Sequence, residues 1–213
     1  MAVKITNGST VHIASGKTAA KIVTVATNAA EAVLTAAAHG LAAGDYVVVT
    51  SGWGALNGRV FRVKAADTGT VTLEGADTTN TNKYPAGGGV GKIEKINGWT
   101  QITQITEVST SGGEQNFAQF GWLEDDFERQ LPTTRSAASL SITIGDDPTL
   151  PGYQAATKAS DSGEEVPLRI VLKNSSVILF NGYASLNKTP SMTRNEIMTV
   201  NMSYALSGLP TRY

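Results

Sequence analysis

The feature that most constrains this chain is a period of two in its apolar side chains. Between residues 198 and 206, every second residue is apolar, and the residues between them are small or polar. Only a β-strand places alternate side chains on one face, so this run predicts a half-buried strand. The run 139–144, with Leu140, Ile142 and Ile144, predicts another strand of the same kind.

Turn signals punctuate further strands. Asn-Gly pairs stand at 7–8, 57–58, 97–98 and 181–182, and each suits a tight turn because both residues tolerate positive φ angles. We expect additional strands at 45–50, 59–64, 70–74, 166–172 and 177–180, the last two as a hairpin around 173–176.

One segment is typical of a helix. Acidic residues and proline at 146–148 precede an alanine-rich stretch, and Ser162-Gly163 provides the stop. Leu150, Tyr153 and Ala156 would share one face of this helix. The predicted fold class is therefore mainly antiparallel β, a sandwich or half-barrel, with one short amphipathic helix.

The composition changes within the first half of the chain. Residues 26–92 are rich in Ala, Thr and Gly and carry short predicted strands. We interpret this segment as a small all-β, barrel-like domain inserted into a larger discontinuous domain formed by 1–25 and 93–213. Such insertions are tolerated because domain termini often lie close together.

Charge and residue usage argue against several functions. The formal net charge is −1 with no Lys/Arg run, so no basic surface is predicted for gripping nucleic acid. The chain has no cysteine and two histidines, and Gly16-Lys17-Thr18 lacks the earlier glycine that a phosphate-binding loop needs. We therefore expect no cofactor, no metal site and no enzymatic activity. We also expect no signal peptide and no membrane segment.

The stretch 110–135 is long and polar, yet it contains Phe117, Phe120, Trp122, Leu123 and Phe127. Long loops in compact domains are usually functional, and aromatic side chains are poorly suited to free solvent. Two interpretations stay open: a loop packed against its own domain, or an arm whose aromatics bury against another subunit. The acidic run 124–128 lacks the alternating ligands of a calcium loop and indicates either a solvated loop or one paired with a partner's basic residues.

Taken in order, the motifs resemble the major tail tube protein of long-tailed, non-contractile-type bacteriophages. The resemblance covers about 1–25 and 93–213. It rests on the segments WTQI at 99–102, ITEV at 105–108, LSITI at 140–144, DDP at 146–148, PGYQAA at 151–156, VPLRIVL at 166–172, FNGYA at 180–184 and SGLP at 207–210. The inserted segment resembles small β modules of phage structural proteins through AHGL at 38–41, GD at 44–45, LNGR at 56–59 and TVTL at 70–73.

This resemblance implies a virion protein of the tail, made in the host bacterial cytoplasm. Its subunits would form hexameric rings whose sheets join edge to edge, and the rings would stack into a tube that passes DNA without binding it specifically. Other implied partners are the tape measure, tail terminator and baseplate proteins. The inserted domain would decorate the exterior.

The resemblance also assigns contact residues. The 110–135 segment would reach the adjacent ring, with inter-subunit or inter-ring contacts through Phe117, Phe120, Trp122, Leu123, Asp125, Asp126, Phe127, Arg129 and Arg135. The helix would lie outside the barrel and support subunit contacts through Leu150, Tyr153 and Ala156.

Alternative functions are another virion ring protein, such as a baseplate hub component or tail terminator, or a carbohydrate- or receptor-binding β module. A glycan-binding module favours an exposed aromatic platform, and Trp53, Trp99 and Trp122 are scattered along the chain. An enzyme is the weakest interpretation, because no nucleophile, base and orienting group occur together.

Overall fold

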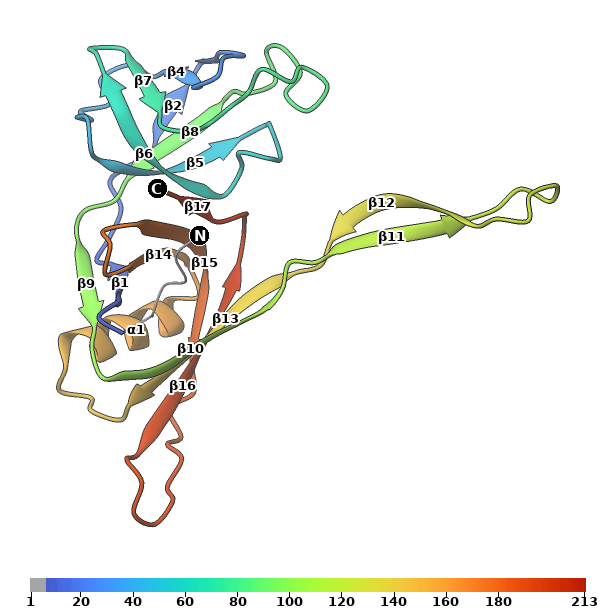
Figure 1. Ribbon diagram of the computed structural model, residues 1–213. Helices are drawn as coiled ribbons and strands as arrows, with labels where there is room; N and C mark the ends of the chain where they lie inside the picture. Colours follow the sequence, from blue (N-terminus) through green and yellow to red (C-terminus); the bar gives the residue numbers. More distant parts are fainter. Residues whose placement is uncertain (1–6) are drawn as a thin grey trace.

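Two antiparallel sheets, one helix and a projecting hairpin make up the molecule (Figure 1). The computed structural model describes residues 7–213. The first six residues, where we expect no signal peptide, lie outside this range. The predicted fold class, mainly β with one short helix, is confirmed.

The larger sheet forms the body of the molecule. Its strand order is β10-β13-β16-β15-β14-β1-β9, with β17 paired to β15. The strands are β1 (Thr10–Ala14), β9 (Trp99–Ile102), β10 (Ile105–Gly112), β13 (Ala138–Gly145), β14 (Glu165–Val171), β15 (Val177–Leu186), β16 (Thr199–Leu206) and β17 (Thr211–Arg212). The two edge strands, β9 and β10, follow each other in the chain, so the sheet curls toward a barrel. Their outer edges pair with no strand of residues 7–213.

The alternating runs lie where the sequence predicts. In β13 and β16 the apolar residues face the core, and Ile142 pairs with Met202, both fully buried. The predicted hairpin around 173–176 joins β14 to β15, with Val171 opposite Val177. Burying one face of a strand favours this single register, because a slip by one residue would expose every apolar side chain.

The turn predicted at Asn181-Gly182 is wrong. Gly8, Gly58 and Gly98 lie outside the strands with positive φ, but β15 continues without interruption through Gly182. A Cβ on Gly182 would lie 2.0 Å from the Ala205 carbonyl oxygen, so glycine here permits close approach to β16. The buried Asn181 amide donates to Glu165 Oε2 at 2.9 Å, a tertiary contact that local turn preference does not reveal.

The smaller sheet lies beside the body and has its own core. Its order is β2-β8-β5-β6-β7-β4-β3. The strands are β2 (Lys21–Val23), β3 (Val25–Ala26), β4 (Val33–Thr35), β5 (Tyr46–Ser51), β6 (Arg59–Ala66), β7 (Thr70–Leu73) and β8 (Gly91–Lys95). Because β2 and β8 belong to it, this sheet begins before residue 26 and ends after residue 92. Its assignment as an inserted exterior domain stays a proposal.

The end of the chain ties the two sheets together. Strand β17 pairs with β15 of the body, while the Tyr213 side chain reaches the smaller sheet. There the Tyr213 hydroxyl accepts from the Arg62 backbone N–H at 2.9 Å and donates to the Glu74 carbonyl at 3.0 Å. The Arg59 guanidinium donates from Nε to the Leu209 carbonyl at 3.1 Å. These bonds join residues about 150 positions apart and fix one sheet against the other.

The helix α1 (Pro151–Ser162) covers the body near β9 and β15. Proline occupies its first turn, and Gly163 ends it in the left-handed conformation with φ 62°. The predicted acidic helix start is wrong by several residues. Asp147 instead accepts hydrogen bonds from Thr149, through its N–H at 3.0 Å and its hydroxyl at 2.6 Å, in a turn that precedes the helix.

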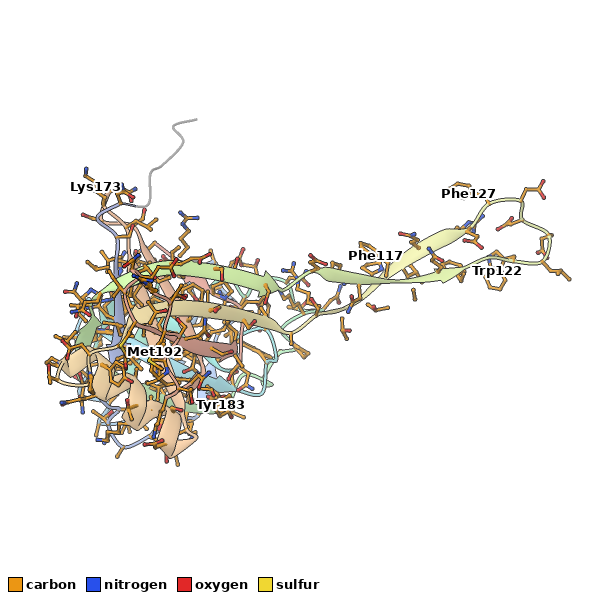
Figure 2. The ribbon with its side chains drawn as sticks, turned by 90° about the horizontal axis from the view of Figure 1, so that it is seen from below. Phe117, Trp122, Phe127, Lys173, Tyr183 and Met192 are labelled. Carbon is orange, nitrogen blue, oxygen red and sulfur yellow. The ribbon has the colours of Figure 1, made fainter. Side chains whose placement is uncertain are left out.

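The segment predicted as a long loop is a β-ribbon. Beyond β10 the chain forms β11 (Gln115–Phe120) and returns as β12 (Arg129–Arg135), and both views show this hairpin extending far from the body (Figures 1 and 2). We call residues 113–136 the arm. Ladder hydrogen bonds between β11 and β12 order it, together with the Gln115 amide, which donates to the Thr133 carbonyl at 2.9 Å. Because neither face of this ribbon is buried, its sequence has no regular alternation of apolar and polar residues, and the two strands could not be predicted from such a pattern.

Candidate assembly interface

The aromatic side chains of the arm lie in solvent. Phe117 is 55 % exposed, Trp122 59 % and Phe127 76 %, and Leu123 is fully exposed. Figure 2 shows Trp122 and Phe127 near the far end and Phe117 partway along the ribbon. The interpretation of a loop packed against its own domain is therefore wrong. Apolar side chains exposed together are typical of a surface that binds another molecule.

The far end of the arm is a defined structure. We call residues 120–129 the arm tip. The rings of Phe120 and Trp122 meet edge to face, with centroids 6.2 Å apart. The Asp125 N–H donates to the Trp122 carbonyl at 3.1 Å, and the Asp125 carboxylate pairs with Arg129 at 3.0 Å. Two of the predicted contact residues thus hold the turn in shape, while Asp126 is exposed beside Phe127.

The structure separates the predicted contact residues along the arm. Seven belong to the arm tip: Phe120, Trp122, Leu123, Asp125, Asp126, Phe127 and Arg129. Phe117 lies between the tip and the body, opposite Pro132. Arg135 lies at the other end, opposite Gln115, where the arm joins the body. These nine residues therefore form a line rather than one cluster, and their contact role stays a prediction.

The three predicted helix residues face inward. Tyr153 and Ala156 are buried in the core of the body, and Leu150 packs against it. The Tyr153 hydroxyl donates to Asp146 Oδ1 at 3.1 Å, and burial together with this carboxylate raises the pKa of Tyr153. Tyr153 and Ala156 are buried and Leu150 is partly buried, so we expect their main support for subunit contacts to come from holding the helix in place.

A groove at the base of the arm was missed by sequence reasoning. It has a volume of about 490 Å³ and is formed by five separate stretches of chain. These include Gly54 and Asn57 of the smaller sheet's β5–β6 connection, residues 110–113 and 135–140 on both strands leading to the arm, Phe180, and residues 206–210 before β17. We call it the base groove. No local pattern could indicate it, because segments up to about 150 positions apart create it.

A second exposed apolar surface lies in the connection 187–198 between β15 and β16. Met192 and Ile197 are each 76 % exposed, and Met198 is exposed beside them. Figure 2 places Met192 on the body, away from the arm. The alternating pattern begins only at Met198, which lies outside β16, and no role was predicted for the rest of this connection.

The residues considered for chemistry have structural roles. Lys17 of the Gly-Lys-Thr sequence donates to the Glu165 carbonyl at 3.1 Å. His39 contacts the backbone: its Nε2 lies 2.6 Å from the Asp67 carbonyl oxygen, and its Nδ1 accepts from the Leu41 N–H at 3.0 Å. Burial, with the nearby Arg169 charge, lowers the pKa of His12.

Two further searches of the described chain gave negative findings. Residues 7–213 contain no group of three His, Asp or Glu side chains placed to hold a metal ion. Within the same residues, α1 falls short of the length and apolar character that a membrane crossing requires.

The fold and its surface define the class: a mainly β protein in which three of the four exposed aromatic residues lie on a projecting hairpin. A family model described as phage tail tube protein (TTP) matches residues 51–213. The chain therefore belongs to the phage tail tube protein family. Membership in this structural family points to a non-enzymatic role in a phage-like particle.

Solved structures give fainter likenesses. The tail of an empty gene transfer agent particle, computed with C6 symmetry, is 13 % identical, with a TM-score of 0.44 over 54 % of this chain and 86 % of that one. A structure of the native gene transfer agent virion is 13 % identical, with a TM-score of 0.42 over 54 % of this chain and 88 % of that one. The anti-feeding prophage tube-terminating cap is 19 % identical, with a TM-score of 0.37 over 49 % of this chain and 78 % of that one. Such scores carry no argument. A search of curated proteins found no match.

Proposed function

We propose that this protein is the repeating subunit of a tail tube, assembled as hexameric rings stacked through their arms. Family membership supports the tube, and the observation that carries the stacking is the arm itself. Its aromatic residues are exposed far from the body, although burial of each such side chain is worth about 1.5–3 kcal/mol. A neighbouring ring provides the surface that the body does not.

The edges of the body support ring formation. Strands β9 and β10 each carry an outer edge that is unpaired within residues 7–213. Exposed edges are liabilities that closed assemblies remove by pairing them with neighbouring copies. We propose that these edges join between subunits of one ring to surround a lumen. DNA would pass through this lumen without specific binding, which agrees with the absence of a Lys/Arg run in the sequence.

The further partners remain those of a tail: the tape measure protein inside the tube, and terminator and baseplate proteins at its ends. The smaller sheet would then lie on the exterior. A terminator or hub component would share the ring but would not polymerise alone, so the behaviour of the pure protein separates these functions.

The experiment is electron microscopy of the purified protein as its concentration is raised. Wild-type protein is expected to form tubes, and Trp122→Ala or Phe127→Ala to leave folded subunits or single rings. Ile22→Ala, which removes an exposed apolar side chain from the smaller sheet, is the matched control and should stack normally. Tubes of normal length from both arm variants would refute stacking through the arm.

A further inference from the structure

We propose that the base groove is the receptor for the arm tip of a second copy of this chain. This inference rests on the proposed function and adds to it the surface that each arm would bind. Three features support it: the shape and lining of the groove, the opposite charges of the groove and the arm tip, and their positions at opposite ends of the arm.

The base groove can accept bulky apolar groups. Leu140 and Phe180 lie at its buried side, and Leu209 contributes an exposed apolar side chain at its rim. Most of the other lining residues are glycine, alanine or serine, which leaves space between the arm's base and the segment before β17. An aromatic ring entering a concave apolar surface loses far more water contact than one lying on a flat surface.

Charge favours the arm tip as the occupant. The tip carries Glu124, Asp125, Asp126 and Glu128 against Arg129, which gives four negative charges, one positive charge and a net charge of −3. Arg135 is the one charged residue lining the groove; it is exposed and forms no ion pair with residues 7–213. Opposite charges at facing surfaces guide the encounter and disfavour other partners.

Charge does not favour the exposed apolar connection between β15 and β16 as the occupant. The connection 187–198 contains Lys188, which pairs with Asp161, and Arg194 against Glu196. It therefore has no negative surplus to attract Arg135. Exposed Ile22 and Val25 of the smaller sheet carry no ring, so among the exposed apolar segments of residues 7–213 only the arm tip combines bulky rings with the complementary sign.

The positions of tip and groove require a second molecule. Leu123, at the far end of the arm tip, follows the groove residue Gly113 by ten positions, and at about 3.3 Å per residue the two lie roughly 33 Å apart. The arm cannot fold back onto its own base while β11 and β12 stay paired. Joining the tip of one copy to the groove of the next is a head-to-tail contact, which continues from copy to copy unless its rotation closes a ring. Successive copies would then be displaced along the arm by about one arm length.

Cysteine cross-linking tests this contact directly, because the chain contains no native cysteine. Leu123→Cys and Ala137→Cys, made in separate chains, are mixed, assembled and oxidised. Both positions are exposed in the free subunit, so both variants should fold. We expect a covalent dimer from the mixture and none from Leu123→Cys mixed with Gln154→Cys, an exposed position on α1. Tubes that yield no dimer through residue 137, or yield it equally through residue 154, would overturn the groove assignment.

Charge reversal gives an independent test. Arg135→Glu should slow tube elongation at least tenfold, and Asp126→Arg in the same chain should restore most of that loss. Normal elongation of Arg135→Glu, or a double variant no faster than the single one, contradicts the proposed pairing. If tubes form normally while both groove tests fail, the groove is wrong and the tube function stands. If the wild-type chain forms no tubes, the proposed function fails and the groove fails with it.

Discussion

The body and the arm are both built from antiparallel strands, yet different interactions stabilise them. In β13 four of eight residues are buried, whereas every residue of β12 is exposed. A two-stranded ribbon without a packed face is only marginally stable in water. The body can therefore fold from its own contacts, whereas the exposed apolar side chains of the arm have no core to pack against. The following predictions test that division.

The largest expected effect is in the core of the body. Ile142→Ala removes a fully buried side chain from β13 and should lower the free energy of unfolding by about 2–5 kcal/mol. Leu131→Ala on the arm, where the side chain is 57 % exposed, should change it by less than about 0.5 kcal/mol. Urea denaturation measures both variants. Similar losses from the two would show that the arm packs against the body in solution.

The junction between the two sheets should respond with an intermediate effect. Tyr213→Phe removes the hydroxyl that bonds the Arg62 N–H and the Glu74 carbonyl, leaving both without that partner. We expect a loss of about 1–3 kcal/mol in the free energy of unfolding, measured by thermal or chemical denaturation. Tyr183→Phe, which removes a hydroxyl from a 48 % exposed side chain, is the matched control and should have little effect. Equal stability of the two variants would mean that the Tyr213 hydroxyl bonds do not stabilise the contact between the two sheets.

A smaller effect is expected from pH at the same junction. Hydrogen bonding to Arg62 lowers the pKa of Glu74 below its ordinary value of 4.5. The folded state therefore binds this proton less readily than the unfolded state. The resulting stability is present above the unfolded pKa and is lost as pH falls through the folded one. Its size should be at most about 1 kcal/mol, because the ion pair is partly exposed.

Chemical denaturation between pH 6 and pH 3 measures this term. Glu74→Gln should flatten the difference in stability across that range relative to the unaltered chain. Parallel pH profiles for the two proteins would mean that the Arg62 contact contributes nothing to folding.

The smallest effect on folding should come from removing the arm entirely. Replacing residues 113–136 with a two-residue Asn-Gly turn should change the free energy of unfolding of the body by less than about 0.5 kcal/mol, because the excised residues pack against no core. Stacking should nevertheless be abolished in electron micrographs. Tubes formed by the shortened chain would show that the arm is dispensable, and a body that no longer folds would show that it is not independent.

Much of the body could be predicted because its signals are local. The alternation at 198–206 and the polar break at 173–176 follow from backbone geometry, and β16 and the β14–β15 hairpin lie there. The arm was predicted as a loop because strands exposed on both faces need no alternation. Its aromatic content still marked it as a candidate contact surface, since that signal depends on residue type rather than on secondary structure.

The sequence by itself determined the β class, the position of the helix face and a family resemblance that the family match supports. These are properties of short stretches, set by side-chain periodicity and order along the chain. Only the tertiary structure decided that the arm stands free, that Gly182 lies within a strand, and that the base groove exists. Each of these depends on which distant segments come together. The residues of segments 54–57 and 206–210, which both line the groove, do not indicate that the two segments meet.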